Sequence, residues 1–171
     1  MKLAYYLDKG GIIMYILAFL SIIGITILIW KFFMLLKTKK NIEKVSKNII
    51  NKNQEKNDRI IIELIKEDVS LLIINLEKGM ETVKTISTVA PLLGLLGTVI
   101  GILDSFEKIA SKGMEASYFA SGISLALITT IGGLIVAIPN TIGYNYLIKI
   151  IDIIEIKINK NTIELINENK K

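Results

Sequence analysis

Three long runs without a charged side chain dominate the hydropathy pattern of the chain. They cover residues 11–30, 85–103 and 116–148. A transmembrane helix needs about 20 consecutive, mainly apolar residues to cross a hydrocarbon core about 30 Å thick, and each run is long enough. The pattern therefore predicts an all-α integral membrane protein with three transmembrane helices. The predicted spans are residues 11–34, 85–105 and 116–140.

The polar segments around these runs show a helical period. In the loop of residues 37–84, the polar stretch NKNQEKND at Asn51 to Asp58 interrupts the period, which predicts helix, turn and helix. The third run is longer than a bilayer needs, so its helix should continue into the tail, residues 149–171. All of this is expected to form one membrane domain, residues 1–171. The periodic apolar residues are Ile62, Ile65, Val69, Leu72, Leu76 and Val83 in the loop, and Leu147, Ile151, Ile154, Ile158 and Leu165 toward the C-terminus.

The distribution of basic residues predicts the orientation. Six lysines lie between Lys31 and Lys47, whereas the segment before the first span has only Lys2 and Lys9 beside Asp8. Because cytoplasmic flanks are enriched in Lys and Arg, we expect the N-terminus outside and the loop and tail in the cytoplasm of a bacterial inner membrane. A cleaved signal peptide is the alternative for the first run, but no small-residue cleavage site follows it.

Small and mildly polar residues line one face of each of the last two spans. Successive members are three or four residues apart, the spacing of one helical face. Gly97 and Gly101 add a GxxxG contact. The two sets are Ser87, Pro91, Gly94, Thr98, Gly101 and Ser105 in the second span, and Gly122, Ala126, Thr130, Gly133, Ala137 and Asn140 in the third.

Two interpretations of these stripes are open. Small residues let helices approach closely, and their hydroxyls can bond to carbonyls one turn earlier. Packing alone does not require a threonine at similar depth on both helices, however, so Thr98 and Thr130 favour a shared lumen or a polar guest helix. No Asp, Glu, Lys or Arg occurs within either run. If protons cross here, another chain must supply the ionisable group.

Composition excludes most chemistry. The 171 residues include neither Cys nor His, so we expect no enzyme, no cofactor and no metal site. The net charge of +5 is concentrated beside membrane segments, which favours contact of Lys31 to Lys40 with membrane phospholipids rather than with nucleic acid.

The segments APLLGLLGTVIGILDSF, residues 90–106, and GISLALITTIGGLIVAIPNTIGYN, residues 122–145, resemble the ExbB/TolQ/MotA family of proton-channel subunits, and the ExbB/TolQ branch most closely. The resemblance implies a homopentamer that surrounds the single spans of an ExbD/TolR-type dimer. It also implies coupling of proton motive force to envelope work through a TonB-like or TolA-like arm. Thr98 and Thr130 correspond to pore-lining threonines of the family.

One residue departs from the family pattern. Members of the ExbB/TolQ branch often have glutamate in the GIxEAL stretch of the third span, where this chain has Leu125. A step that depends on that glutamate is therefore not expected here, and a partner aspartate with threonine-bound water would have to suffice. The alternatives are a TolQ-type envelope-maintenance subunit, a homo-oligomeric scaffold built by the glycine stripes, and a small transporter acting alone.

Overall fold

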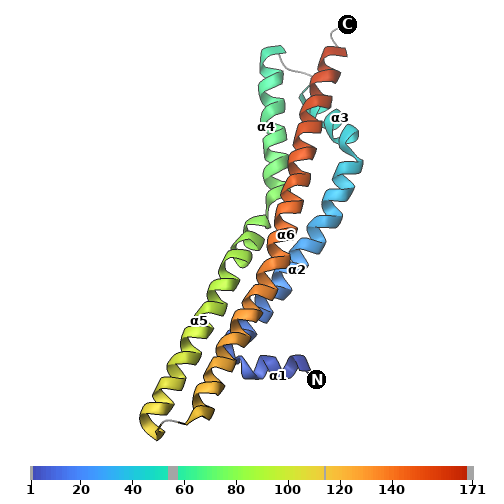
Figure 1. Cartoon of the computed structure of the whole chain (residues 1–171). Helices are drawn as coiled ribbons and strands as arrows, with labels where there is room; N and C mark the ends of the chain where they lie inside the picture. Colours follow the sequence, from blue (N-terminus) through green and yellow to red (C-terminus); the bar gives the residue numbers. More distant parts are fainter. Residues whose placement is uncertain (1, 54–57, 114, 169–171) are drawn as a thin grey trace. The chain divides into compact units, whose positions relative to one another are not determined.

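The computed structural model is built from helices alone over the residues it describes (Figure 1). It describes the backbone of residues 2–53, 58–113 and 115–168, and the side chains of residues 6–52, 63–113 and 115–164. The helices are α1 (Lys2–Lys9), α2 (Gly11–Lys40), α3 (Ile42–Asn53), α4 (Asp58–Glu77), α5 (Met80–Lys112) and α6 (Ala116–Glu168).

Three joints between helices depend on glycine. Gly11, Gly79 and Gly113 have φ angles of 62°, 89° and 90°. Such left-handed conformations are accessible to glycine without a steric penalty, which makes glycine the usual residue where a helix stops. Gly11 is the first residue of α2, and Gly79 and Gly113 follow the ends of α4 and α5.

The predicted spans are confirmed as helices. α2, α5 and α6 are each long and apolar enough to cross a membrane. The third helix also continues as predicted, since α6 runs unbroken for 53 residues. A break between two helices is confirmed, but the predicted stretch of Asn51 to Asp58 is too long, because α3 continues to Asn53 and α4 begins at Asp58. There the Lys52 ammonium binds the Asp68 carboxylate of α4 at 2.6 Å, which favours the extra turn. Residues 54–57 of the break lie outside the described residues.

The chain divides into two compact units. The first, here called the span unit, comprises residues 1–27 and 82–143. The second, the bundle unit, comprises residues 28–81 and 144–171. The boundaries fall inside α2, α5 and α6, so these three helices contribute to both units.

The bundle unit has a core of large aliphatic side chains from α2, α3, α4 and α6. Most of the periodic residues predicted to be apolar contacts are in it: Ile65, Val69, Leu76, Leu147, Ile151, Ile154 and Ile158 are all buried. Leu72 packs at its edge. The side chains of Ile62 and Leu165 lie outside the described residues. The amphipathic pattern therefore identified the buried face of α4 and of the C-terminal part of α6.

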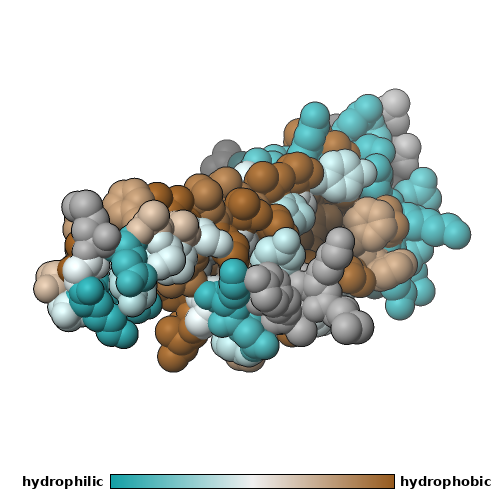
Figure 2. Space-filling view, turned by 60° about the horizontal axis from the view of Figure 1, so that its bottom comes forward, coloured by the Kyte–Doolittle hydropathy of each residue, from teal (hydrophilic) through white to brown (hydrophobic). Residues whose placement is uncertain are grey.

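The span unit has a smaller core and leaves many apolar side chains exposed. Its buried aliphatic cluster contains six residues from α2, α5 and α6: Ile13, Leu17, Ile86, Ala90, Val136 and Ala137. Exposed Leu, Ile, Val and Phe residues follow the outer faces of the same helices. Figure 2 shows hydrophobic side chains over a large part of the surface in view. Such a surface suits lipid or protein neighbours.

Candidate functional site

In the span unit, α5 and α6 meet through glycines that bring the two backbones together. A Cβ atom on Gly133 would lie 2.6 Å from the carbonyl oxygen of Ala90, and one on Gly94 would lie 2.8 Å from that of Thr129. Both distances are shorter than real Cβ contacts, and backbone atoms cannot move away as a flexible side chain can. The two glycines are therefore required for this helix contact.

The GxxxG pair lies in the same contact. Gly97 faces the side chain of Thr129, and a Cβ on Gly101 would lie 3.0 Å from the carbonyl oxygen of Gly122. The hydroxyl of Ser105 continues the contact, because it donates to the carbonyl of Tyr118 at 3.3 Å. Most of the two predicted stripes thus face each other within one chain.

The two predicted threonines meet in this contact. The hydroxyl oxygens of Thr98 and Thr130 are 2.5 Å apart and form a hydrogen bond. The Thr130 hydroxyl lies 3.1 Å from the carbonyl oxygen of Ala126. The Thr98 hydroxyl lies 3.2 Å from that same carbonyl oxygen and 3.2 Å from the carbonyl oxygen of Gly94. The two threonines that the stripes place at similar depth on two helices therefore contact each other directly.

This geometry allows two arrangements of the hydroxyl protons. Each threonine has one hydroxyl proton, and one of the two lies between the oxygens. If Thr98 donates to Thr130, then Thr130 donates to the carbonyl of Ala126; in the reverse case, Thr98 donates to a carbonyl. In both cases the protein uses both protons, and oxygen lone pairs remain free. The pair can therefore accept a hydrogen bond from a donor group of another molecule.

The threonine pair lies at the edge of an apolar surface. Both side chains are half-buried. One helical turn away, the exposed side chains are all aliphatic: Leu95 and Ile102 on α5, and Leu127 and Leu134 on α6. The nearest ion pair on α5 lies near the C-terminal end of the helix, where Lys108 Nζ is 2.6 Å from Asp104 Oδ2. The two hydroxyls are thus a polar spot between aliphatic walls.

Other residues of the stripes have different neighbours. Pro91 is half-buried in α5. Ala126 of α6 is buried next to Gly101 of α5. Ala137 belongs to the aliphatic cluster with Ile13 and Leu17 of α2.

Asn140 packs against Gly24 of α2. The stripe of small residues did not predict this contact. The pattern did contain a signal for it, since Gly24 is the one glycine inside an otherwise large apolar run from Ile12 to Trp30.

Comparison with protein families matches residues 36–160 to the family described as the MotA/TolQ/ExbB proton channel family. The chain belongs to this family. The matched region includes Thr98 on α5 and Thr130 on α6. The resemblance inferred from residues 90–106 and 122–145 is thereby confirmed.

Curated relatives agree with this family assignment. The chain is 47% identical over 75 residues to a biopolymer transport protein ExbB of Aquifex aeolicus, a match that covers 43% of this chain and 51% of the relative. It is 41% identical over 92 residues to an ExbB of Helicobacter pylori, covering 53% and 63% respectively. The chain thus spans between about half and two thirds of these relatives. Membership of the MotA/TolQ/ExbB family and the three apolar helices identify a multi-pass membrane protein of a proton-channel family.

Proposed function

We propose that this chain is an ExbB-type subunit of a proton-driven motor. Five copies, with their N-termini outside a bacterial inner membrane, surround the single spans of an ExbD/TolR-type dimer. Proton flow through the complex drives envelope work, such as TonB-dependent uptake through a TonB-like arm; Tol-type envelope maintenance through a TolA-like arm is the alternative. The Thr98–Thr130 hydroxyl pair on an open apolar face is the observation that supports this proposal most directly.

The pair is suited to receive a proton carrier rather than to be one. A threonine hydroxyl does not ionise near neutral pH, and residues 85–103 and 116–148 contain no ionisable acid or base apart from tyrosine. Because both hydroxyl protons are used internally, the free lone pairs accept a hydrogen bond from a protonated carboxyl group or from water. A partner aspartate would therefore be held at this level in its neutral form.

Leu125 changes the surroundings of this step. It occupies the position where the ExbB/TolQ pattern often has glutamate, and its side chain is half-buried near Gly101. Residues 85–103 and 116–148 contain no carboxylate, so the partner's carboxyl and water are the groups available to move the proton along these runs.

Proton flux in liposomes tests the role of the pair. The chain is reconstituted with an ExbD/TolR-type partner, and flux is measured with a pH-sensitive dye. Thr98→Val and Thr130→Val should each reduce flux at least tenfold while the complex still co-purifies. Thr26→Val is the matched control, since Thr26 is an exposed threonine of α2 that bonds only to the carbonyl of Ile22 in its own helix.

Two results would contradict the proposal. Wild-type flux in both threonine variants would remove the pair from the proton path. Flux that survives loss of the partner's membrane aspartate would exclude that aspartate as the carrier.

A homo-oligomeric scaffold built by the glycine stripes has less support. Gly94, Gly97, Gly101, Gly122 and Gly133 are all occupied by the α5–α6 contact within one chain. The stripes therefore do not need a second copy to account for them.

A further inference from the structure

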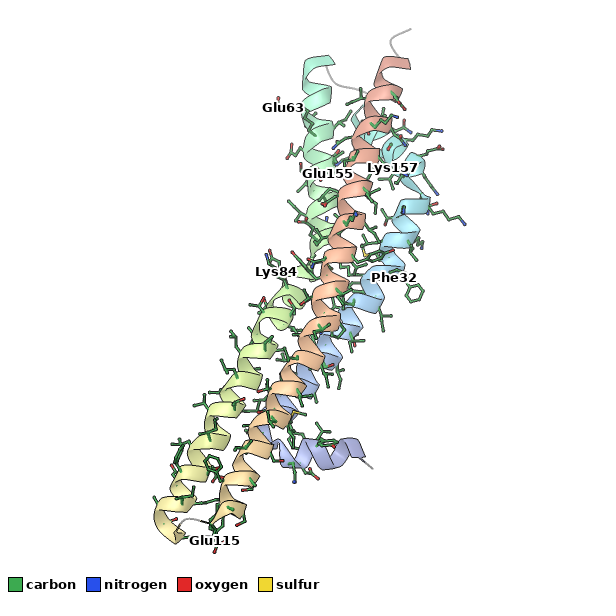
Figure 3. All side chains as sticks on the ribbon, in the orientation of Figure 1. Phe32, Glu63, Lys84, Glu115, Glu155 and Lys157 are labelled. Carbon is green, nitrogen blue, oxygen red and sulfur yellow. The ribbon has the colours of Figure 1, made fainter. Side chains whose placement is uncertain are left out.

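Four lysines from three helices gather around one cavity of the bundle unit. The cavity has a volume of about 500 Å³. Lys40 ends α2, Lys44 lies in the first turn of α3, and Lys157 and Lys160 lie on α6; Figure 3 labels Lys157. The remaining lining residues are Asn41, Ile42, Glu43 and Asn161.

The positive charge of this cavity is poorly neutralised. Among the described residues, Lys40, Lys44 and Lys157 form no ion pair, and the ammonium of Lys160 is 3.8 Å from the carboxylate of Glu164. Glu43 is the only acid in the lining. Four ammonium groups around a shared space repel one another, and a bound anion would replace that repulsion with attraction.

Uncharged donors point to the kind of anion. Asn41 and Asn161 carry side-chain amides, each with two N–H donors. The cavity also includes the first residues of α3, a 12-residue helix whose first-turn N–H groups have no partner within the helix. Ammonium, amide and helix N-terminal donors together match a group with several oxygen acceptors, and phosphate is such a group.

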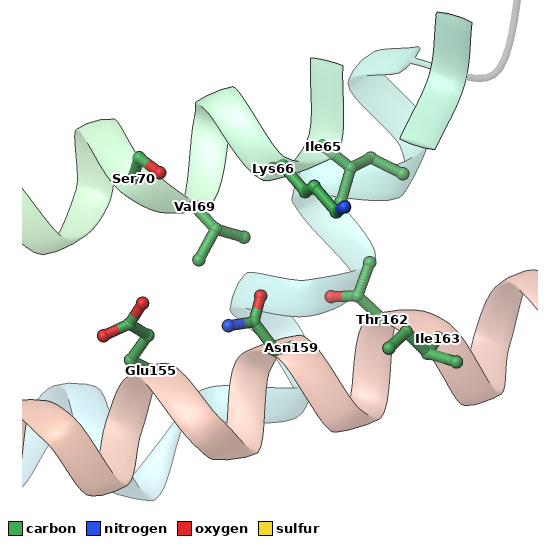
Figure 4. A pocket seen from close by; sticks show the side chains of 8 residues that line it. All are labelled: Ile65, Lys66, Val69, Ser70, Glu155, Asn159, Thr162 and Ile163. Atoms are coloured by element: carbon green, nitrogen blue, oxygen red, sulfur yellow. The ribbon is translucent and has the colours of Figure 1, made fainter. Parts of the chain in front are cut away.

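A second cavity of the bundle unit shows that this charge is not a general property of the surface. It has a volume of about 320 Å³ and lies between α4 and α6 (Figure 4). Its charged lining residues are Lys66 and Glu155, one of each sign. The excess of lysine therefore distinguishes the cavity at the start of α3 from the cavity between α4 and α6.

The distance from the uncharged runs leaves two sources for a phosphate group. Lys40 follows Trp30, the last residue of the first uncharged run, by ten residues of α2, and Lys157 follows Ile148 by nine residues of α6. At 1.5 Å per residue, the two lysines lie about 15 Å and about 14 Å along their helices from the ends of these runs. A soluble phosphate compound can reach the lysines from the solvent. A lipid phosphate could bind only if the lysine side chains extend toward the membrane surface.

We propose that the cavity lined by Lys40, Lys44, Lys157 and Lys160 binds a phosphate group, from a soluble phosphate compound or from an anionic lipid. This site is independent of the threonine pair and of proton flux. It gives the bundle unit a binding function of its own.

Residue-resolved acetylation of lysines tests the site and distinguishes the two sources. The complex is placed in nanodiscs of phosphatidylcholine with and without tripolyphosphate, and in nanodiscs containing phosphatidylglycerol without it. Acetylation of each lysine by an acetyl ester is then followed by mass spectrometry. Protection of the four lysines at least threefold greater than that of Lys47 and Lys66, two exposed lysines outside the cavity, is expected in one arm. Protection by tripolyphosphate identifies a soluble ligand, and protection by phosphatidylglycerol identifies a headgroup.

Paired variants provide the second measurement. Lys157→Gln with Lys160→Gln should weaken saturable tripolyphosphate or lipid binding at least tenfold. Lys47→Gln with Lys66→Gln removes the same charge from exposed positions outside the cavity and should change binding less than threefold. Equal weakening by both pairs, or equal protection of all lysines in every arm, would overturn the proposal.

Discussion

Different kinds of contact stabilise the interior of the span unit and the interior of the bundle unit. In the span unit, α5 and α6 touch at backbone distance through Gly94 and Gly133, and a threonine pair bonds across them. In the bundle unit, large side chains such as Leu35, Ile154 and Ile158 form the core. Lipid is as apolar as leucine, so helices in a membrane gain little from burying aliphatic side chains. Helices in water gain about 1.5–3 kcal/mol for each such side chain.

The largest expected effect comes from filling the α5–α6 contact. Gly133→Leu would place a side chain where the carbonyl of Ala90 already lies, so the helices must separate. We expect loss of folded, assembled complex in size-exclusion chromatography. Ala120→Leu is the control, because it is the same kind of enlargement at an exposed position of α6. Normal assembly of Gly133→Leu would show that the close backbone contact is dispensable.

A cavity in the bundle core should have the next largest effect. Ile154 is fully buried, and Ile154→Ala should lower the free energy of unfolding of the bundle unit by about 2–5 kcal/mol. Hydrogen exchange of α4 and of residues 144–164 measures this loss. Ile156→Ala is the same substitution at a side chain that is 66% exposed, and it should have little effect. Equal effects of the two variants would contradict the core described for this unit.

A polar contact of the bundle unit should rank third. The ammonium of Lys31 is buried and donates to the carbonyls of Leu76 at 2.9 Å and Asn75 at 3.3 Å, at the C-terminal end of α4. Lys31→Met keeps the length of the side chain but removes these bonds, at a cost of about 1–3 kcal/mol.

Faster hydrogen exchange around Gly79 would report the loss of this cap. Lys37→Met, at an exposed position of the same helix, should leave that exchange unchanged. Equal exchange in the wild type and Lys31→Met would show that the cap does not hold the end of α4.

The smallest effect is expected at Asn140. Its side-chain amide donates to the carbonyl of Val136 at 2.7 Å, but its Oδ1 is buried against Gly24 and has no hydrogen-bond partner among the residues that the structure describes. Asn140→Leu removes an unsatisfied acceptor together with the hydrogen bond to Val136, so the free energy of unfolding should change by about 1 kcal/mol or less. Thermal denaturation measures this change. Gly24→Val enlarges the opposite side of the same contact and should destabilise it more. A large loss in Asn140→Leu alone would reveal a role for the amide beyond packing.

The linear pattern was sufficient for several features of this protein. Uncharged runs long enough to cross a bilayer predicted α2, α5 and α6, and the heptad-like spacing of Val69, Ile154 and Ile158 predicted the buried faces of the bundle unit. Both follow from periodicity, which is a property of neighbouring residues in the sequence. The motifs around Thr98 and Thr130 also led to the proton-channel family, which the family match confirms.

Tertiary structure alone decided which faces meet. The spacing of Gly94, Gly133 and Asn140 placed them on helix faces, but a face does not name its partner. The structure pairs the two glycines with each other across α5 and α6, and Asn140 with Gly24 of α2.

The lysine cavity also depends on contacts between helices that the sequence pattern does not predict. Lys40 and Lys157 are 117 positions apart in the chain, and only packing brings them to one cavity. Helical periodicity is local, so the sequence by itself determined the helices, their buried faces and the family. Contacts between helices are not local, and they appeared only when the chain was folded.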